Sequence, residues 1–122
     1  MEDPPPLRIF YVEDNPLIVF HVEAMIEDLG HVFVGSAASF VEMVEMLRDL
    51  DVDGVLVDID LADGRTGPAA AAWLHERGIP TLFVTGQELI AAEHLTALAT
   101  VRKPVSAFDL AEKLQLLRDD RG

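Results

Sequence analysis

The residues best suited to chemistry are three acids, a threonine and a lysine: Glu13, Asp14, Asp58, Thr85 and Lys103. Carboxylates that lie together repel one another unless a cation lies among them, and Mg²⁺ prefers such oxygen ligands. Asp58 is the best nucleophile, because a carboxylate can attack phosphorus and form an acyl phosphate. Mg²⁺ and Lys103 would supply the positive charge that phosphoryl transfer needs, and Thr85 could donate a hydrogen bond to a phosphoryl oxygen. Brought together, these residues predict phosphoryl transfer onto Asp58.

Short apolar runs alternate with longer amphipathic segments along the chain. We expect strands at Leu7–Val12, His31–Gly35, Val55–Ile59, Thr81–Val84 and Thr100–Arg102. We expect helices from Pro16 to just before Gly30, at Phe40–Leu50, from Pro68 to about Arg77, at Glu88–Leu98 and from Ala107 to about Arg118. The candidate N-caps are Asp14 or Asn15, Ser39 and Ser106. Five β-α units in strict alternation predict an α/β fold with a parallel sheet and helices on both faces.

This alternation also gives the site residues a common location. In an open α/β sheet, ligands bind outside the carboxyl ends of the strands, where the strand order reverses. Glu13 and Asp14 follow the first strand, Asp58 ends the third, Thr85 follows the fourth and Lys103 follows the fifth. If the first and third strands are neighbours, the three carboxylates converge. Asp58 is the strongest single indication of a functional site, because a charged residue in an apolar central strand is costly without a purpose.

The composition limits the class of protein. The chain has 122 residues, half of them apolar, which suits one domain with one sizeable core. We expect residues 1–6 to be a disordered lead-in, 7–118 to be the domain and 119–122 to be a tail. The lack of cysteine excludes disulfides, zinc–thiolate sites and thiol nucleophiles.

Charge and hydropathy limit the partners. The net charge of −13 disfavours direct binding to nucleic acids or anionic membranes. No apolar stretch is long enough to span a bilayer, and the N-terminus lacks the pattern of a signal peptide. A cytoplasmic location is therefore expected.

The site residues together resemble the signature of a known family. An acidic pair after the first strand, Asp58, Thr85 and then Lys103-Pro104 occur in the order typical of the receiver domains of two-component response regulators. The resemblance extends from Leu7 to about Arg118. It implies a flavodoxin-like three-layer (βα)5 sandwich with a parallel five-stranded sheet in the order 2-1-3-4-5. It also implies a signalling domain and not a turnover enzyme.

The resemblance further implies a role for each residue. Asp58 would accept the phosphoryl group from a phosphohistidine of a sensor histidine kinase or histidine phosphotransfer protein, and slow hydrolysis would follow. Mg²⁺ would be held by the side chains of Glu13, Asp14 and Asp58 and by the backbone carbonyl of Asp60. Lys103 would pair with the phosphoryl group and form a cis peptide bond with the following proline. Thr85 would move toward the phosphoryl group on activation.

Two features depart from the common pattern of the family. Many receivers carry an aromatic switch residue on the fifth strand, and the matching position here is Thr100. Thr85 and Lys103 are separated by a short interval, and the Thr85-Gly86 pair is similar to that of an atypical subgroup of receivers. Both departures concern the signalling surface and leave the phosphorylation chemistry unchanged.

A docking patch for the phosphodonor is expected beside the first helix. Leu17 and Ile18 are adjacent apolar residues, and both cannot face the core equally. With His21, Pro104 and Val105 they could receive a helix of the kinase or phosphotransfer protein. Scattered surface apolar residues are the alternative interpretation. The sequence leaves the oligomeric state open, a dimer included.

Two other functions compete with the receiver hypothesis. The Asp58-Ile59-Asp60 segment resembles the start of haloacid-dehalogenase-type phosphatases, in which Asp60 would act as general acid. That motif normally follows the first strand of its domain, whereas here two β-α units precede it. The second alternative is a pseudo-receiver, a binding module that keeps the fold without being phosphorylated.

Overall fold

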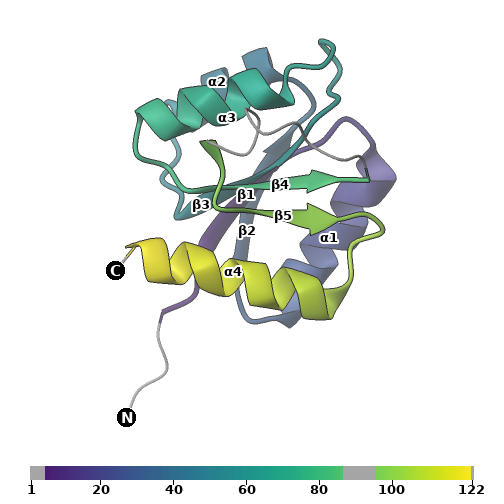
Figure 1. Ribbon diagram of the computed structural model, residues 1–122, viewed down its shortest axis with the longest axis vertical. Helices are drawn as coiled ribbons and strands as arrows, with labels where there is room; N and C mark the ends of the chain where they lie inside the picture. Colours follow the sequence, from purple (N-terminus) through teal and green to yellow (C-terminus); the bar gives the residue numbers. More distant parts are fainter. Residues whose placement is uncertain (1–4, 87–95, 122) are drawn as a thin grey trace.

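Five parallel strands form one sheet in the order β2-β1-β3-β4-β5 in the computed structural model, which describes residues 5–86 and 96–121. This is the predicted strand order, with β1 and β3 adjacent near the centre (Figure 1). The strands are β1 (Arg8–Val12), β2 (Val32–Ala37), β3 (Gly54–Asp58), β4 (Thr81–Thr85) and β5 (Ala99–Arg102).

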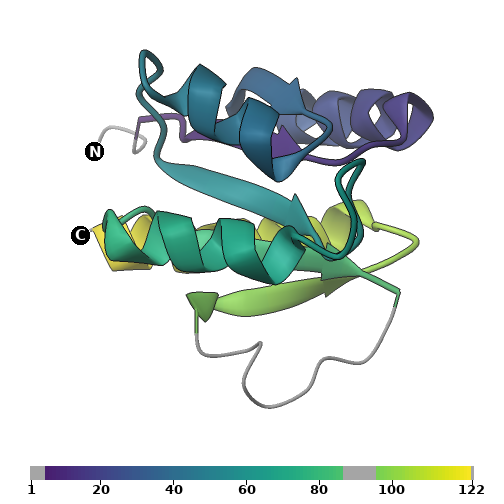
Figure 2. The same cartoon turned by 90° about the horizontal axis from the view of Figure 1, so that it is seen from above.

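Helices cover both faces of this sheet, as the alternating pattern predicted. They are α1 (Pro16–Asp28), α2 (Phe40–Leu47), α3 (Gly67–Glu76) and α4 (Ala107–Arg121). The α2 and α3 helices pack on one face, and α1 and α4 pack on the other (Figures 1 and 2). The predicted helix at 88–98 lies almost entirely outside the described residues. Within the described ranges, no helix combines the length and the apolar character that a bilayer crossing requires.

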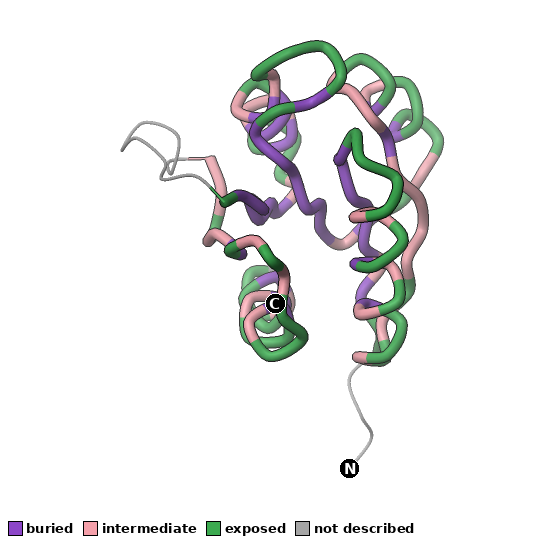
Figure 3. The backbone as a smooth tube through the Cα atoms, turned by 90° about the vertical axis from the view of Figure 1, so that its right-hand side faces the viewer, coloured by how far each residue is buried: buried purple, intermediate pink, exposed green. Residues whose placement is uncertain are grey.

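The central strands are buried because helices cover them on both sides. Every residue of β3 and β4 is buried, and these strands form the middle of the molecule in Figure 3. Side chains alternate between the two faces of the sheet. Phe10 and Val57 therefore pack against α2 and α3, whereas Tyr11 and Leu56 pack against α1 and α4. The two apolar layers hold the carboxyl ends of the strands in fixed positions.

The predicted helix starts agree with the structure to within one residue, whereas the predicted ends of α2 and α4 do not. Side-chain oxygens of Asn15, Ser39 and Ser106 accept backbone N–H groups of the first turns at 3.0, 3.1 and 3.2 Å respectively. The α2 helix ends three residues before the predicted Leu50. The α4 helix continues to Arg121, so residues 119–121 of the expected tail are helical. Hydrogen bonding between side chains one turn apart, Gln115 Nε2 to Asp119 Oδ1 at 3.0 Å, supports this last part.

His31 adds a pH-dependent contribution to the stability of this fold. Its Nδ1 atom accepts a hydrogen bond from the backbone N–H of Leu7 at 3.0 Å. Burial, with the nearby charge of Arg118, lowers the pKa of His31 from its ordinary 6.5. The folded state therefore binds this proton less tightly than the unfolded chain does. The contribution is complete above about pH 6.5 and is lost as the pH falls toward the folded pKa.

We expect the melting temperature of the wild type to fall more, between about pH 7.5 and about pH 5.5, than that of His31→Asn. The asparagine amide oxygen can accept the same N–H of Leu7 and does not titrate. Carboxylates elsewhere in the chain affect both proteins alike. Melting curves across this pH range measure the difference, and parallel declines in the two proteins would contradict the role of His31.

Candidate functional site

Three carboxylates converge at the carboxyl ends of β1 and β3, as the strand order required. One oxygen of each of Glu13, Asp14 and Asp58 can be chosen so that all three lie within 4.8 Å of one another. Glu13 and Asp58 are buried, with 3% and 8% of their surface exposed, whereas Asp14 is open to solvent. Two buried acids at this spacing require a compensating positive charge.

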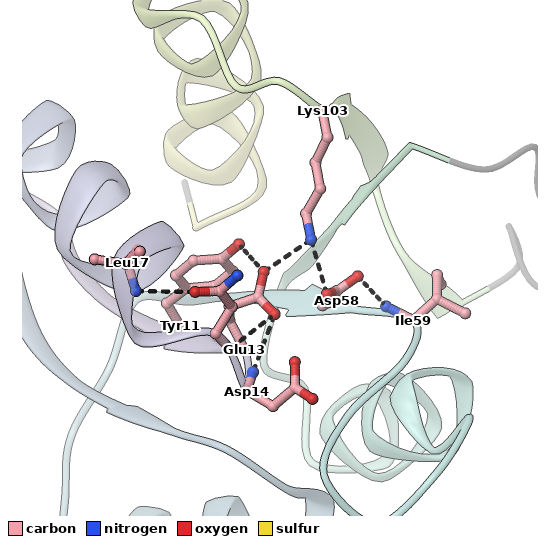
Figure 4. Close-up of polar contacts among 8 residues, drawn as sticks. Tyr11, Glu13, Asp14, Leu17, Asp58, Ile59 and Lys103 are labelled. Atoms are coloured by element: carbon pink, nitrogen blue, oxygen red, sulfur yellow. Dashed lines mark hydrogen bonds and ion pairs between the residues drawn. The ribbon is translucent and has the colours of Figure 1, made fainter.

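Lys103, which follows β5, supplies part of that charge. Its Nζ atom lies 2.8 Å from Asp58 Oδ2 and 2.8 Å from Glu13 Oε1 (Figure 4). Burial alone would lower the pKa of Lys103, but the hydrogen bonds and negative charges of the two acids outweigh it and raise that pKa. The side chain is therefore a permanent ammonium group between the two buried carboxylates.

Backbone N–H groups fix the remaining oxygens of these acids. Glu13 Oε2 accepts hydrogen bonds from the N–H groups of Asp14 at 3.0 Å and Asn15 at 3.4 Å. Asp58 Oδ1 accepts the N–H of Ile59 at 2.7 Å. Each buried carboxylate thus has its orientation set from both sides, by the chain that follows it and by Lys103.

The cluster retains an excess of negative charge. Three carboxylates face one ammonium group, and partial desolvation together with Glu13 raises the pKa of Asp14. A set of carboxylate oxygens with this excess matches the ligand preference of Mg²⁺. The donor set therefore fits the divalent cation that the sequence predicted.

Tyr11 also belongs to this site, although the sequence analysis missed it. Its hydroxyl donates a hydrogen bond to Glu13 Oε1 at 3.3 Å, and its ring is fully buried (Figure 4). Burial, with the negative charges of Glu13 and Asp58, raises the pKa of Tyr11 far above its usual range, so the phenol stays protonated. The available signal was the spacing, because residues two apart in a strand share a face.

The other predicted residues lie around this cluster. Thr85 is buried at the end of β4, and its carbonyl accepts the N–H of Lys103 at 3.1 Å. Asp60 is exposed in the turn after β3. The bond between Lys103 and Pro104 is cis, as predicted. Thr100 pairs with Phe83 across β5 and β4, so a small hydroxyl side chain occupies the position expected for an aromatic one.

Asp63 has a role that the sequence did not reveal. It lies in the loop between β3 and α3. Its two carboxylate oxygens accept the N–H groups of Phe40 at 3.2 Å and Val41 at 3.4 Å, and Thr66 donates to Oδ1 at 2.6 Å. The loop that follows Asp58 is thereby attached to the start of α2.

The five residues expected to form a docking patch line one groove. Leu17, Ile18, His21, Pro104 and Val105 enclose about 580 Å³ together with Val22 and Lys103. Lys103 therefore lies both in this groove and in the carboxylate cluster.

Comparisons with known proteins agree with this geometry. Residues 9–115 match the family model of the response regulator receiver domain. The phyllosphere-induced regulator PhyR of Methylorubrum extorquens is 33% identical over 110 residues, which cover 88% of this chain and 39% of PhyR. The chain thus spans about two fifths of the length of this curated relative.

Solved structures give the same result. The receiver domain of Erythrobacter litoralis PhyR matches with a TM-score of 0.82 and 26% identity, covering 93% of this chain and 90% of that one. PhyR from Brucella abortus matches with a TM-score of 0.78 and 34% identity, covering 92% of this chain and 47% of that one. This chain therefore belongs to the family of response regulator receiver domains, which are signalling modules of two-component systems and not turnover enzymes.

Proposed function

We propose that this domain accepts a phosphoryl group on Asp58 from a phosphohistidine of a sensor histidine kinase or a histidine phosphotransfer protein. The observation that carries the proposal is the position of the Lys103 ammonium, 2.8 Å from a buried Asp58 carboxylate inside a cluster of three acids. We also propose that this domain acts in the cytoplasm. Labelling with a small phosphodonor, with Asp58→Asn as the comparison, tests the proposal.

We also propose that this site binds Mg²⁺ through oxygen ligands of four residues. The side chains of Glu13, Asp14 and Asp58 and the backbone carbonyl of Asp60 would hold the ion. When bound, Mg²⁺ supplies the positive charge that allows an anionic phosphoryl group to approach an anionic nucleophile.

The transfer itself exchanges one bond for another. An oxygen of Asp58 attacks phosphorus, an O–P bond forms, and the P–N bond to the donor imidazole breaks. The electron pair of the broken bond returns to the imidazole, which takes up a proton. Lys103 stabilises the charge on the phosphoryl oxygens, and Thr85 donates a hydrogen bond to one of them. Hydrolysis of the acyl phosphate then restores the carboxylate and releases inorganic phosphate.

The position of Asp58 disfavours the phosphatase alternative. In that fold the nucleophile follows the first strand, whereas Asp58 ends β3 and the acidic pair follows β1. The pseudo-receiver alternative makes a different prediction, since it requires that the wild type remain unlabelled.

We further propose that the groove beside Lys103 seats a helix of the phosphodonor. A helix in this groove would bring its phosphohistidine close to Asp58, because Lys103 lines both places. We expect Leu17→Asp to slow transfer from a phosphorylated histidine phosphotransfer domain about tenfold, since it introduces a charge into an apolar contact. Labelling by a small phosphodonor should be unchanged. Time courses with the two donors measure the difference.

Two features make this test specific for docking. Leu17 is 79% exposed, and an acid in the first turn of α1 suits the helix dipole, so the fold should be unaffected. The control is Val41→Asp on α2, where a 62% exposed apolar residue lies outside the groove. If the two variants accept the phosphoryl group from the protein donor at the same rate, the groove is not the docking site.

A further inference from the structure

Two donors share one oxygen of Glu13, and they differ in strength. Lys103 Nζ lies 2.8 Å from Glu13 Oε1, whereas the Tyr11 hydroxyl lies 3.3 Å from the same atom. An O–H···O hydrogen bond is usually shorter than this. Lys103 is therefore the main partner of this oxygen, and Tyr11 is a second donor already in place.

Lys103 cannot serve every acceptor once Asp58 carries a phosphoryl group. Its ammonium now bridges Glu13 and Asp58, and the phosphoryl group would add negative charge on the Asp58 side. The side chain of Glu13 is only 1% exposed, so water cannot readily replace a lost partner. A buried carboxylate oxygen without a donor is costly. Among the described residues, Tyr11 is the other side chain bonded to Oε1.

The Tyr11 ring is well placed to act as this second partner. It is fully buried and packs in the apolar layer formed with α1 and α4. Close packing prevents it from turning to another acceptor. Its hydroxyl therefore stays beside Glu13 Oε1 and remains its donor when Lys103 leaves.

We propose that Tyr11 is a positioning residue, whose hydroxyl takes over Glu13 Oε1 when Lys103 turns from Glu13 toward a phosphoryl group on Asp58. This inference rests on the proposed function. Tyr11 does not touch the reacting atoms. It allows Lys103 to move because its hydroxyl keeps a hydrogen bond to Glu13 Oε1. Without the hydroxyl, Lys103 stays bound to Glu13 and serves the phosphoryl group less well.

The first test is a double-mutant cycle in the absence of any phosphodonor. Tyr11→Phe and Lys103→Met are made singly and together, and urea unfolding gives the stability of each protein. We expect removal of the hydroxyl to cause a clearly larger loss of stability in the Lys103→Met background than in the wild type. Additive effects of the two substitutions would overturn the proposal.

The second test is the rate of labelling by acetyl phosphate in Mg²⁺. Tyr11→Phe should be labelled about tenfold more slowly than the wild type, the usual scale for the loss of an outer hydrogen bond at such a site. Thr81→Val is the matched control. It also removes a buried hydroxyl with a 3.3 Å hydrogen bond, to the carbonyl of Ile79 at the opposite end of the sheet, and should be labelled at the wild-type rate.

The two tests separate this inference from the proposed function. If the wild type is never labelled, phosphorylation of Asp58 is wrong, and the takeover by Tyr11 fails with it. If the wild type is labelled and Tyr11→Phe matches its rate, only the role of Tyr11 is wrong. A slower rate that Thr81→Val shares equally would indicate a general effect of lost stability and would also overturn the proposal.

Discussion

Asp58→Asn should gain no mass when incubated with acetyl phosphate and Mg²⁺, whereas the wild type should gain the mass of one phosphoryl group. The amide has nearly the same shape as the carboxylate; its single oxygen can still accept the N–H of Ile59, and Lys103 keeps its second partner, Glu13. It lacks the negative oxygen that attacks phosphorus. We therefore expect complete loss of labelling with little loss of stability. Intact-mass spectrometry of the unfolded chain measures the result.

Asp60→Asn provides the matched control, because it removes the same charge from a neighbouring position. Asp60 is exposed, and only its backbone carbonyl is assigned to the site, so labelling should remain at the wild-type level. A chelator that removes Mg²⁺ should suppress labelling of the wild type. It should have no further effect on Asp58→Asn.

Each contrary result identifies a different error. A phosphoryl group on Asp58→Asn would show that another residue accepts it. An unlabelled wild type would support the pseudo-receiver interpretation. Steady turnover of a phosphate ester that disappears in Asp60→Asn would support the phosphatase alternative.

Gly67→Ala should destabilise the domain by about 3 kcal/mol, because a methyl group at this position has no room. Gly67 begins α3, and its N–H donates to the carbonyl of Ile59 at 2.9 Å. An added Cβ would overlap the carbonyl oxygen of Asp58 and would lie 2.6 Å from the Cα atom of Ile59. Those atoms belong to backbone, which cannot turn aside as a flexible side chain can. Urea unfolding measures the loss.

Gly86→Ala is the control for this substitution. Among the described residues, its added Cβ would meet the Cβ atom of Lys103 at an ordinary 3.8 Å, so its stability should stay close to that of the wild type. Gly67→Ala should also be labelled more slowly, since the displaced backbone includes Asp58. Equal unfolding midpoints for the two variants would mean that the start of α3 is not tightly packed against the loop.

The carboxylate cluster could be predicted because it depends on topology and not on side-chain detail. Asp58 stood out as a charge in an apolar run, and the rule for parallel sheets placed it near Glu13. Adjacent β1 and β3 strands were enough to bring the two together. Lys103 was placed by the same rule, at the end of β5.

The hydrogen bonds of Tyr11 and Asp63 depend on details that sequence patterns do not contain. Tyr11 lies inside the predicted first strand, and spacing alone does not say how far its hydroxyl reaches. Asp63 caps α2, which begins more than twenty positions earlier in the chain. This contact depends on how the loop after β3 meets the loop after β2. The extension of α4 to Arg121 was missed because the apolar pattern ends at Leu117 and two acids, Asp119 and Asp120, are unfavourable near a helix C-terminus.

The ion pair between Glu13 and Lys103 joins residues 90 positions apart in the chain. During synthesis the acidic residues leave the ribosome before the lysine does, so the ammonium group that bridges Glu13 and Asp58 is the last part of the cluster to be made. A fragment that ends before β5 would contain the nucleophile but not the ammonium beside it. Under the proposed function, the residues that would accept and hold a phosphoryl group are all present only when β5 has joined the sheet.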